Sequence, residues 1–416
     1  MKRIIVVGAG AAGLMAATIA AREGAVVTLI EKMNMIGKKM GITGKGRCNI
    51  TNNAPIEDFI GNTPGNGKFL LSPYQQFDNR DLLALLDHWK LKTKVERGGR
   101  IFPESDSALE VRDMFMRVFK GYGGTLHLNE AVKELIVEDN CIKGVKTSRE
   151  TYYADAVILA TGGLSYPLTG STGDGYEMAK QVGHKITDLR PSLVPIETKE
   201  NWVKELMGLS LRNVELSVWA KDKVQGKMFG EMMFTHFGIT GPIVLSLSHT
   251  VGKLMKKKNI GAIELHINLK PALTQEQLDL RVQKDFQLYS KKQLANGLKD
   301  LLPQRLIPVI IREAGLSEQK FINQISREER LRLVHTLQHL KLTFKSLRPI
   351  AEAIVTSGGI SVKEFKPKTM ESKLIKGLYG AGEVLDIDAF TGGYNLQAAF
   401  STGYVAAMHA VHGDLD

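Results

Sequence analysis

The first thirty residues contain the feature that most restricts how this chain can fold. Two apolar runs, residues 3–7 (RIIVV) and 25–30 (AVVTLI), flank a stretch from 11 to 23 with the composition and length of a helix. Three glycines in the spacing GxGxxG join the first run to this helix. A strand, a glycine turn, a helix and a second strand form one βαβ unit, and such units build parallel sheets. The sequence therefore predicts an α/β protein that opens with a Rossmann-like domain.

The same N-terminal run imitates a signal peptide or a membrane helix. Lys2 and Arg3 precede an uncharged run over residues 4–21, as in both kinds of segment. The glycines argue against both, because they divide the run into a strand, a turn and a helix.

The chain has only two cysteines, Cys48 and Cys141, too few for a disulfide framework or a four-thiolate zinc site. We expect a cytoplasmic protein with no membrane span and no metal site.

The glycine turn is typical of a dinucleotide site because each glycine has a separate task. Gly8 allows the tight turn, Gly10 lets the backbone approach a pyrophosphate, and Gly13 lets the helix pack closely on the strand. The phosphate charge then lies at the helix N-terminus. Glu31 ends the second strand, where it can accept the ribose hydroxyls. A close-packed turn without a ligand is the alternative interpretation.

Two further glycine turns favour FAD over a nicotinamide as the bound dinucleotide. ATGG at 160–163 follows a buried strand, and GAGE at 380–383 lies near the C-terminus. An FAD laid across a sheet is touched by early, middle and late segments, whereas a nicotinamide usually needs one such approach. GGYNL at 392–396 is expected to begin the last helix, whose N-terminus would raise the tendency of a flavin to accept a hydride. An ordinary helix cap is the alternative.

Charge and pattern divide the rest of the chain. Residues 190–364 hold 27 Lys and Arg against 17 Asp and Glu, a net charge of +10, while the remaining residues have a net charge of +1. Such a step indicates a separate module. Strand-like runs cover 214–220, 232–235, 243–247 and 263–269, a helical block follows over 274–340, and 341–363 is again strand-like. Residues 33–67 lack periodicity and are expected to form a long loop or arm.

Five longer motifs add to this pattern. They are GKGRCNITN at 44–52, FTHFGITGP at 234–242, TSGG at 356–359, TMESK at 369–373 and GEVLDID at 382–388. With them the chain resembles, essentially end to end, the bacterial NAD(P)/FAD-dependent oxidoreductases described as BaiN-like or aminoacetone-oxidase-like. The resemblance implies an FAD-binding domain interrupted by a β-barrel-like module that carries a small helical subdomain.

The expected fold class is therefore α/β, with a discontinuous Rossmann-like FAD-binding domain at residues 1–190 and 365–416. The inserted β-barrel-like module covers 191–273 and 341–364, and it contains a helical subdomain at 274–340. The residues expected to bind FAD are Gly8, Gly10, Ala12, Gly13, Glu31, Lys32, Gly44, Arg47, Cys48, Val132, Thr161, Gly162, Gly382, Glu383, Gly393, Asn395 and Leu396.

A second GxGxxG for a dedicated nicotinamide domain is absent from the sequence. NAD(P)H is therefore expected as a transient co-substrate that reduces the flavin, which then passes the hydride to a small organic substrate. Arg47, His236 and Tyr394 are the candidate catalytic residues. Arg47 would bind an anionic group or stabilise negative charge on the flavin, and His236 or Tyr394 would donate the accompanying proton. A structural role is the alternative for each.

Two other functions stay open at this stage. A flavin amine oxidase would be reoxidised by dioxygen while an amine becomes a carbonyl compound. A flavin-dependent protein that binds or modifies nucleic acid would use the basic segment, although no aromatic residues alternate with its lysines and arginines, so nucleic acid ranks below a small molecule as the partner.

Overall fold

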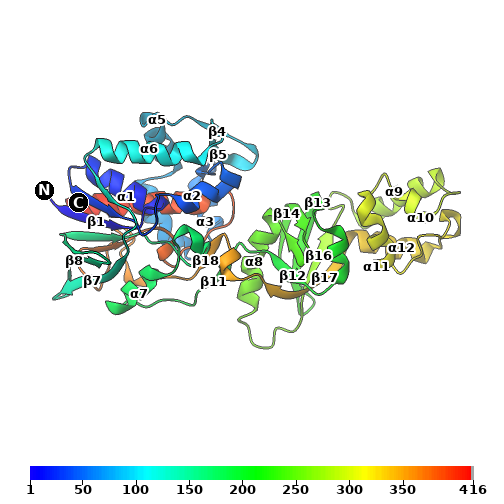
Figure 1. Ribbon diagram of the computed structural model, residues 1–416. Coiled ribbons are helices and arrows are strands. Elements are labelled where there is room, and N and C mark those ends of the chain that lie inside the picture. Colours follow the sequence, from blue (N-terminus) through cyan, green and yellow to red (C-terminus); the bar gives the residue numbers. More distant parts are fainter. Residues whose placement is uncertain (414–416) are drawn as a thin grey trace. The chain divides into compact units, whose positions relative to one another are not determined.

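The computed structural model describes residues 1–413, which form two compact units (Figure 1). The first unit holds residues 1–191 and 350–413, and the second unit holds residues 192–349. The chain returns to the first unit at residue 350, earlier than the expected residue 365. The reason lies in strand β18 (Val355–Ser357), where the Thr356 N–H donates to Glu383 and the Thr356 hydroxyl accepts from the Leu164 N–H, both in the first unit.

The first unit is built on a five-stranded parallel sheet. In spatial order its strands are β19 (Leu378–Gly380), β10 (Ala156–Leu159), β1 (Arg3–Val7), β2 (Val26–Ile30) and β6 (Thr125–His127). Ile4 to Val7 and Ala156 to Leu159 are all buried, as expected for central strands covered on both faces. The predicted parallel sheet is therefore confirmed, and strands from early, middle and late parts of the chain lie side by side in it.

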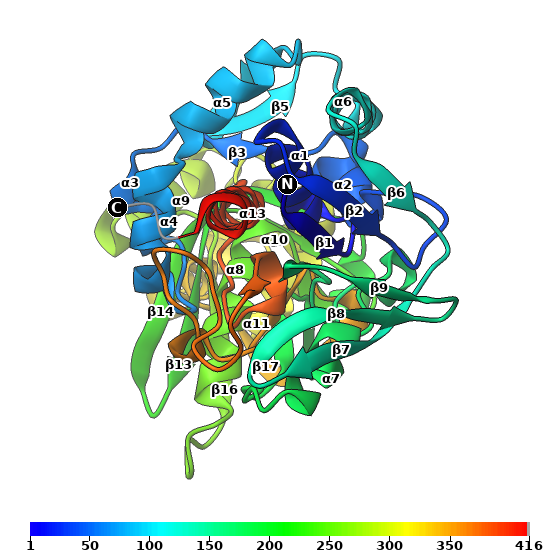
Figure 2. The same cartoon turned by 90° about the vertical axis from the view of Figure 1, so that its left-hand side faces the viewer.

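Helix α1 (Ala11–Arg22) follows β1 and packs against the C-terminal helix α13 (Tyr394–His412). Their contact is close because Gly403 has no side chain: a Cβ there would lie 2.4 Å from the Ala12 carbonyl oxygen. Figure 2 shows α13 nearly end-on beside α1. The longer helices that complete the first unit are α5 (Asn79–His88), α6 (Ala108–Gly121) and α7 (Asp174–Gln181).

Residues 33–67 are more structured than the sequence indicated. They include helices α2 (Lys38–Ile42) and α3 (Ile56–Gly61) and the short strand β3 (Thr51–Asn52). Helices of five and six residues are too short to display an apolar repeat, so the pattern looked like a loop. Strand β3 joins the hairpin of β4 (Thr93–Val95) and β5 (Arg100–Pro103), and α4 (Leu71–Gln76) follows α3. A second small sheet contains β7 (Val132–Glu138), β8 (Cys141–Thr147) and β9 (Thr151–Tyr153).

The second unit contains a closed barrel, as predicted. Its strands in order are β12 (Ile196–Thr198), β15 (Gly238–Thr240), β14 (Lys223–Phe234), β13 (Ser210–Ala220), β16 (Ile263–Asn268) and β17 (Leu340–Leu347). Alternate residues of β13 and β16 are buried, and they form part of a hydrophobic core separate from that of the first unit. The helical block contains α9 (Gln275–Leu288), α10 (Leu294–Gly297), α11 (Ile307–Glu313) and α12 (Arg327–Gln338).

One predicted strand of the second unit is wrong. Residues 243–247 belong to helix α8 (Pro242–Leu254), which begins with proline at its first position after Gly241. Most of this helix is buried, and a short buried helix and a buried strand both give continuous apolar runs. Among residues 1–413, no helix is both long and apolar enough to span a bilayer.

Candidate active site

A large cavity opens at the carboxyl ends of β1, β2, β10 and β19, where ligands bind in open α/β sheets. Together with the open solvent at its mouth, the space between its walls is about 1370 Å³. All three glycine turns contribute to its wall. The predicted cofactor residues that line it are Gly8, Gly10, Ala12, Glu31, Lys32, Val132, Thr161, Gly162, Gly382, Glu383, Asn395 and Leu396.

The first glycine turn has the geometry that a dinucleotide needs. Gly8 has φ +97°, and a Cβ at Gly13 would lie 1.8 Å from the Gly8 carbonyl oxygen. A Cβ at Gly10, in contrast, would meet no atom within 4 Å, and Gly10 lines the cavity. Two of the glycines therefore allow the backbone to pack, and the third leaves room for a ligand beside the N-terminus of α1. Gly13 itself does not line the cavity.

Glu31 at the end of β2 holds this turn in place. Its two carboxylate oxygens accept hydrogen bonds from the backbone N–H groups of Ala9 and Met33, each at 2.8 Å. Each oxygen keeps a further lone pair for a hydroxyl of a ligand. The next residue, Lys32, forms an ion pair of 2.7 Å with Asp174. Burial alone would raise the pKa of Asp174, but the hydrogen bonds from Lys32 and Thr172 outweigh it and lower this pKa.

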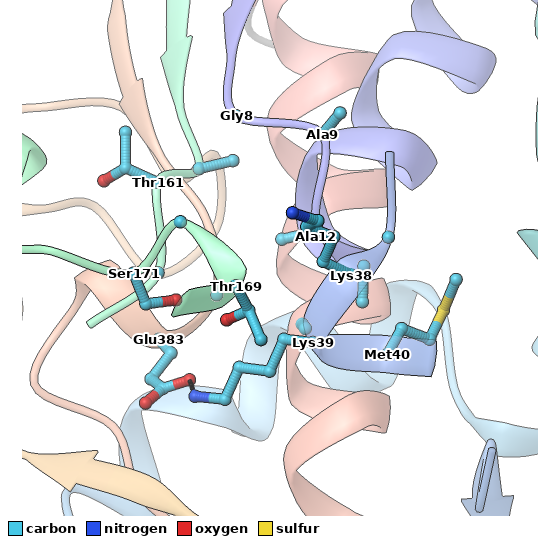
Figure 3. A pocket seen from close by; sticks show the side chains of 18 of the residues that line it. Gly8, Ala9, Ala12, Lys38, Lys39, Met40, Thr161, Thr169, Ser171 and Glu383 are labelled. Carbon is cyan, nitrogen blue, oxygen red and sulfur yellow. Dashed lines mark hydrogen bonds and ion pairs between the residues drawn. The ribbon is translucent and has the colours of Figure 1, made fainter. Parts of the chain in front are cut away.

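A hydrogen-bonded network lies at one edge of the cavity. It includes Lys39, a lining residue that was not predicted from the sequence. Lys39 Nζ lies 2.6 Å from Glu383 Oε2 and 2.6 Å from Ser165 Oγ, and Ser165 donates to Glu383 Oε1 at 3.0 Å. Figure 3 shows Lys39 of α2 and Glu383 meeting end to end, with Ala12, Thr169 and Ser171 around the same space. The only signal in the sequence was the Gly37-Lys38-Lys39 run after the second strand.

The N-terminus of α13 supplies positive potential at the wall of the cavity. Asn395 and Leu396 lie in the first turn of this 19-residue helix, which contains no acidic residue. The first N–H groups of a helix have no partner within it and carry partial positive charge. The Asn395 side chain is occupied elsewhere, since it accepts from the Ala389 N–H at 2.9 Å and donates to the Ala389 carbonyl at 2.8 Å. This side chain therefore fixes the loop before α13.

The residues present fit FAD. Thr161 lines the cavity, and its buried hydroxyl, which lies beside Gly175, has no hydrogen-bond partner in the described part of the chain. Glu31, the open space at Gly10 and the start of α13 lie along one cavity. Glu31 suits a ribose, and the space at Gly10 suits a pyrophosphate. The start of α13 suits a flavin ring that gains negative charge.

Arg47 and Cys48 were expected at the cofactor, and neither lines the cavity. The Arg47 guanidinium pairs with Glu96 at 2.7 Å and Asp106 at 3.2 Å and lies 4.1 Å from the centre of the Phe102 ring. The hydrogen bond to Glu96 raises the pKa of Arg47. Cys48 is completely buried, and burial raises the pKa of its thiol to about 12. Both side chains thus stabilise the region after α2, and a contact with the cofactor stays a prediction.

Gly44, Gly393 and Tyr394 also lie outside the lining. Gly393 precedes α13 with φ +100°, and a Cβ there would lie 2.3 Å from the Thr51 carbonyl oxygen. The Tyr394 ring packs edge-on against Phe59, 5.0 Å between centres. Partial burial, with a smaller contribution from the charge of Asp58, raises the pKa of Tyr394, so its hydroxyl keeps its proton at neutral pH.

His236 belongs to the second unit, in the turn between β14 and β15. Its ring contacts that of Phe237, 4.9 Å between centres. The neighbouring Thr235 hydroxyl accepts from the Gly238 N–H at 3.1 Å and closes the turn. The role of His236 as a proton donor stays a prediction.

The fold and this cavity define an FAD-dependent oxidoreductase. The sequence profile of the HI0933-like protein Rossmann domain matches residues 2–409. The chain therefore belongs to the HI0933-like family, as the resemblance in the sequence indicated.

Two curated relatives are similar over nearly their whole length. The 3-dehydro-bile acid delta(4,6)-reductase of Clostridium scindens is 30% identical over 420 residues, 99% of each chain. The ribosomal RNA dihydrouridine synthase of Haemophilus influenzae is 30% identical over 410 residues, 97% of each chain. Among solved structures, the 3-ketosteroid delta1-dehydrogenase of Sterolibacterium denitrificans aligns over 100% of both chains with a TM-score of 0.53 and 14% identity. This last likeness concerns the fold alone.

Proposed function

We propose that this protein uses FAD to reduce a carbon–carbon double bond conjugated to a carbonyl group in a small organic molecule, with NAD(P)H as the transient hydride donor. The observation that carries the proposal is the single cavity shared by three glycine turns and the N-terminus of α13. Such a cavity suits a flavin dinucleotide in extended form, with its ring near a positive helix end.

The names of the two relatives support the type of bond. A 3-dehydro-bile acid with double bonds at positions 4 and 6 is a conjugated ketone. Uridine, from which dihydrouridine is made, also has a ring double bond conjugated to a carbonyl. Both reductions add a hydride to the carbon distant from the carbonyl and a proton to the adjacent carbon. One reaction type therefore accounts for two different substrates.

The residues of this chain have limited and separate tasks in such a reaction. A bound FAD would supply the hydride-transfer chemistry between a nicotinamide and the substrate. The first turn of α13 stabilises negative charge beside it. Glu31 and the turn at Gly10 hold the adenosine half, and the Lys39–Glu383 pair holds the segment after β2 at the cavity. Tyr394 precedes the lining residues Asn395 and Leu396 on α13 and does not itself line the cavity; its protonated hydroxyl is the candidate for donating a proton once substrate is bound.

Anaerobic titration tests this proposal. The purified protein should be yellow, NADH or NADPH should bleach the flavin absorbance, and a conjugated enone should restore it with formation of the saturated ketone. The amine oxidase alternative predicts bleaching by an amine and rapid reoxidation by air with stoichiometric peroxide. A folded protein that stays colourless with added FAD would contradict both.

A second candidate function is the reduction of uridine within RNA, and the second unit favours it. This unit holds 25 Lys and Arg against 15 Asp and Glu, a net charge of +10. The sequence showed no aromatic platform among these charges, but two partly buried rings of the barrel lie face to face. Trp219 of β13 stacks on His266 of β16 with ring centres 5.0 Å apart, and His339 lies 6.0 Å from His266. Basic surfaces with stacking rings bind single-stranded nucleic acid.

Fluorescence anisotropy with labelled single-stranded RNA tests the second candidate. The double variant Trp219→Ala/His266→Ala should bind about tenfold more weakly, since one stacked base is worth roughly 1–3 kcal/mol. Phe229→Ala is the control, because this exposed side chain lies on the neighbouring strand β14. Equal affinities of the double variant, the control and the unaltered protein would remove the proposal for this face.

A further inference from the structure

A second cleft of the first unit has a different character from the cofactor cavity. Helix α4, the C-terminal end of α13 and the loop at 366–373 form its walls. No residue lines both the cleft and the cofactor cavity. His409 lies fifteen residues beyond Tyr394 on α13, about 22 Å along the helix at 1.5 Å per residue. The cleft is therefore remote from the flavin end of α13. We call it the basic cleft.

The basic cleft contains an excess of positive charge. Lys366, Lys368 and Lys373 line it, and no acidic residue does. Lys366 forms an ion pair of 2.7 Å with Glu371. Lys373 donates to the neutral Lys363 carbonyl at 2.8 Å, and Lys368 has no ion-pair partner among the described residues. At least two ammonium charges in one cleft are thus uncompensated.

His409 lines the cleft from α13, and hydrogen bonds hold its buried ring in place. Gln76 Nε2 donates to the Lys368 carbonyl at 2.8 Å, which fixes the direction of the Gln76 amide and turns its oxygen toward His409. His409 Nε2 lies 3.2 Å from that oxygen, and His409 Nδ1 lies 3.0 Å from the Gly413 carbonyl oxygen. Both ring nitrogens of His409 therefore have a hydrogen-bond partner, which fixes the ring at the wall of the cleft.

We propose that the basic cleft binds a phosphate group, carried either by a small phosphorylated metabolite or by the backbone of RNA. Lys368 and Lys373, which have no acidic partner among the described residues, match a phosphate dianion better than a single carboxylate. The Ser72 hydroxyl also lines the cleft and can donate to a phosphate oxygen. The site does not depend on the reaction proposed above, because it shares no residue with the cofactor cavity.

Isothermal titration calorimetry with inorganic phosphate tests this proposal on the full-length protein with its flavin bound. The variant Lys368→Gln/Lys373→Gln should lose at least tenfold in phosphate affinity. Lys120→Gln is the matched control, because Lys120 is an exposed lysine on α6 outside the cleft. An unchanged flavin spectrum and thermal unfolding midpoint show that the double variant is folded. No phosphate binding by the unaltered protein, or equal binding by the double variant, would overturn the proposal.

A short single-stranded RNA distinguishes the two sources of the phosphate group. If the backbone of RNA supplies it, the double variant weakens RNA binding as well, and free phosphate competes with the RNA. If a metabolite supplies it, the double variant weakens only the binding of free phosphate, and RNA binding stays as in Lys120→Gln. Either result supports a phosphate site in the basic cleft.

Discussion

Lys39 Nζ lies 2.6 Å from Glu383 Oε2, although the two residues are 344 positions apart in the sequence. The pair joins the short helix after the second strand of the sheet to the turn after the last strand. Ser165 and Thr356 complete the network, with the Thr356 N–H donating to Glu383 Oε1 at 2.8 Å. Four distant segments are thereby fixed around one edge of the cofactor cavity.

Lys39→Met is expected to weaken FAD binding by about tenfold. The substitution leaves the partly buried Glu383 carboxylate without its cation, which costs roughly 1–3 kcal/mol, and it frees α2 from the wall of the cavity. Flavin fluorescence during dilution or dialysis measures the dissociation constant. Lys45→Met is the control, because Lys45 is exposed and lies on the same segment. Equal dissociation constants for the two variants would contradict the role of Lys39.

Two glycines of one motif are expected to fail in different ways. Gly13→Ala places a methyl group 1.8 Å from the Gly8 carbonyl oxygen. It should therefore lower the free energy of unfolding by about 1–3 kcal/mol, the usual cost of overpacking. Gly10→Ala meets open space, so it should fold normally and lose FAD affinity. Denaturant unfolding and flavin titration of both variants separate the two effects. A stable Gly13→Ala variant, or an unstable Gly10→Ala variant, would refute this division.

Cys48 is expected to resist alkylation in the folded protein at pH 8, while Cys141 reacts. Burial raises the pKa of the Cys48 thiol from 9.0 to about 12, whereas Cys141 is partly exposed. Because the neutral thiol is the form that the fold prefers, its contribution to stability is complete below pH 9 and is lost as pH rises toward 12. Mass spectrometry after treatment with a maleimide should show one modification in the native state and two after unfolding.

Tyr394→Phe separates the two half-reactions. The raised pKa of Tyr394 keeps the proton on its hydroxyl, so removal of this hydroxyl should slow transfer to the substrate by about 10²-fold, the lower end for general acid catalysis. Reduction of the flavin by NAD(P)H should stay unchanged, and stopped-flow absorbance follows both steps. His236→Ala in the same assay tests the second donor. Normal flavin binding and normal turnover in either variant would remove that residue from the mechanism.

The sequence specified the first unit well because its signals are local. The spacing of Gly8, Gly10 and Gly13 predicts a particular turn, and the positions of the buried runs predict the parallel strands that surround it. The carboxyl ends of those strands had to meet at one edge, so Glu31 and Thr161 could be assigned to one cavity before any contact was known. Helix α8 was not predictable in this way, since its apolar run suits a strand or a helix equally. The boundary at residue 350 was not predictable either, because it depends on hydrogen bonds of Thr356 with Leu164 and Glu383, which are distant in the sequence.

By itself, therefore, the sequence determined the dinucleotide-binding turn, the presence of an inserted β module and the order of the segments around the cavity, and the family resemblance implied that this module is a barrel. Only the tertiary structure decided which side chains are available there. In the folded protein Lys39 forms an ion pair with Glu383, Arg47 forms an ion pair with Glu96, and the Cys48 side chain is buried. The physical reason is that a turn depends on the backbone conformations of adjacent residues. An ion pair or the burial of a side chain depends instead on segments that are distant in the sequence and come together only in the folded protein.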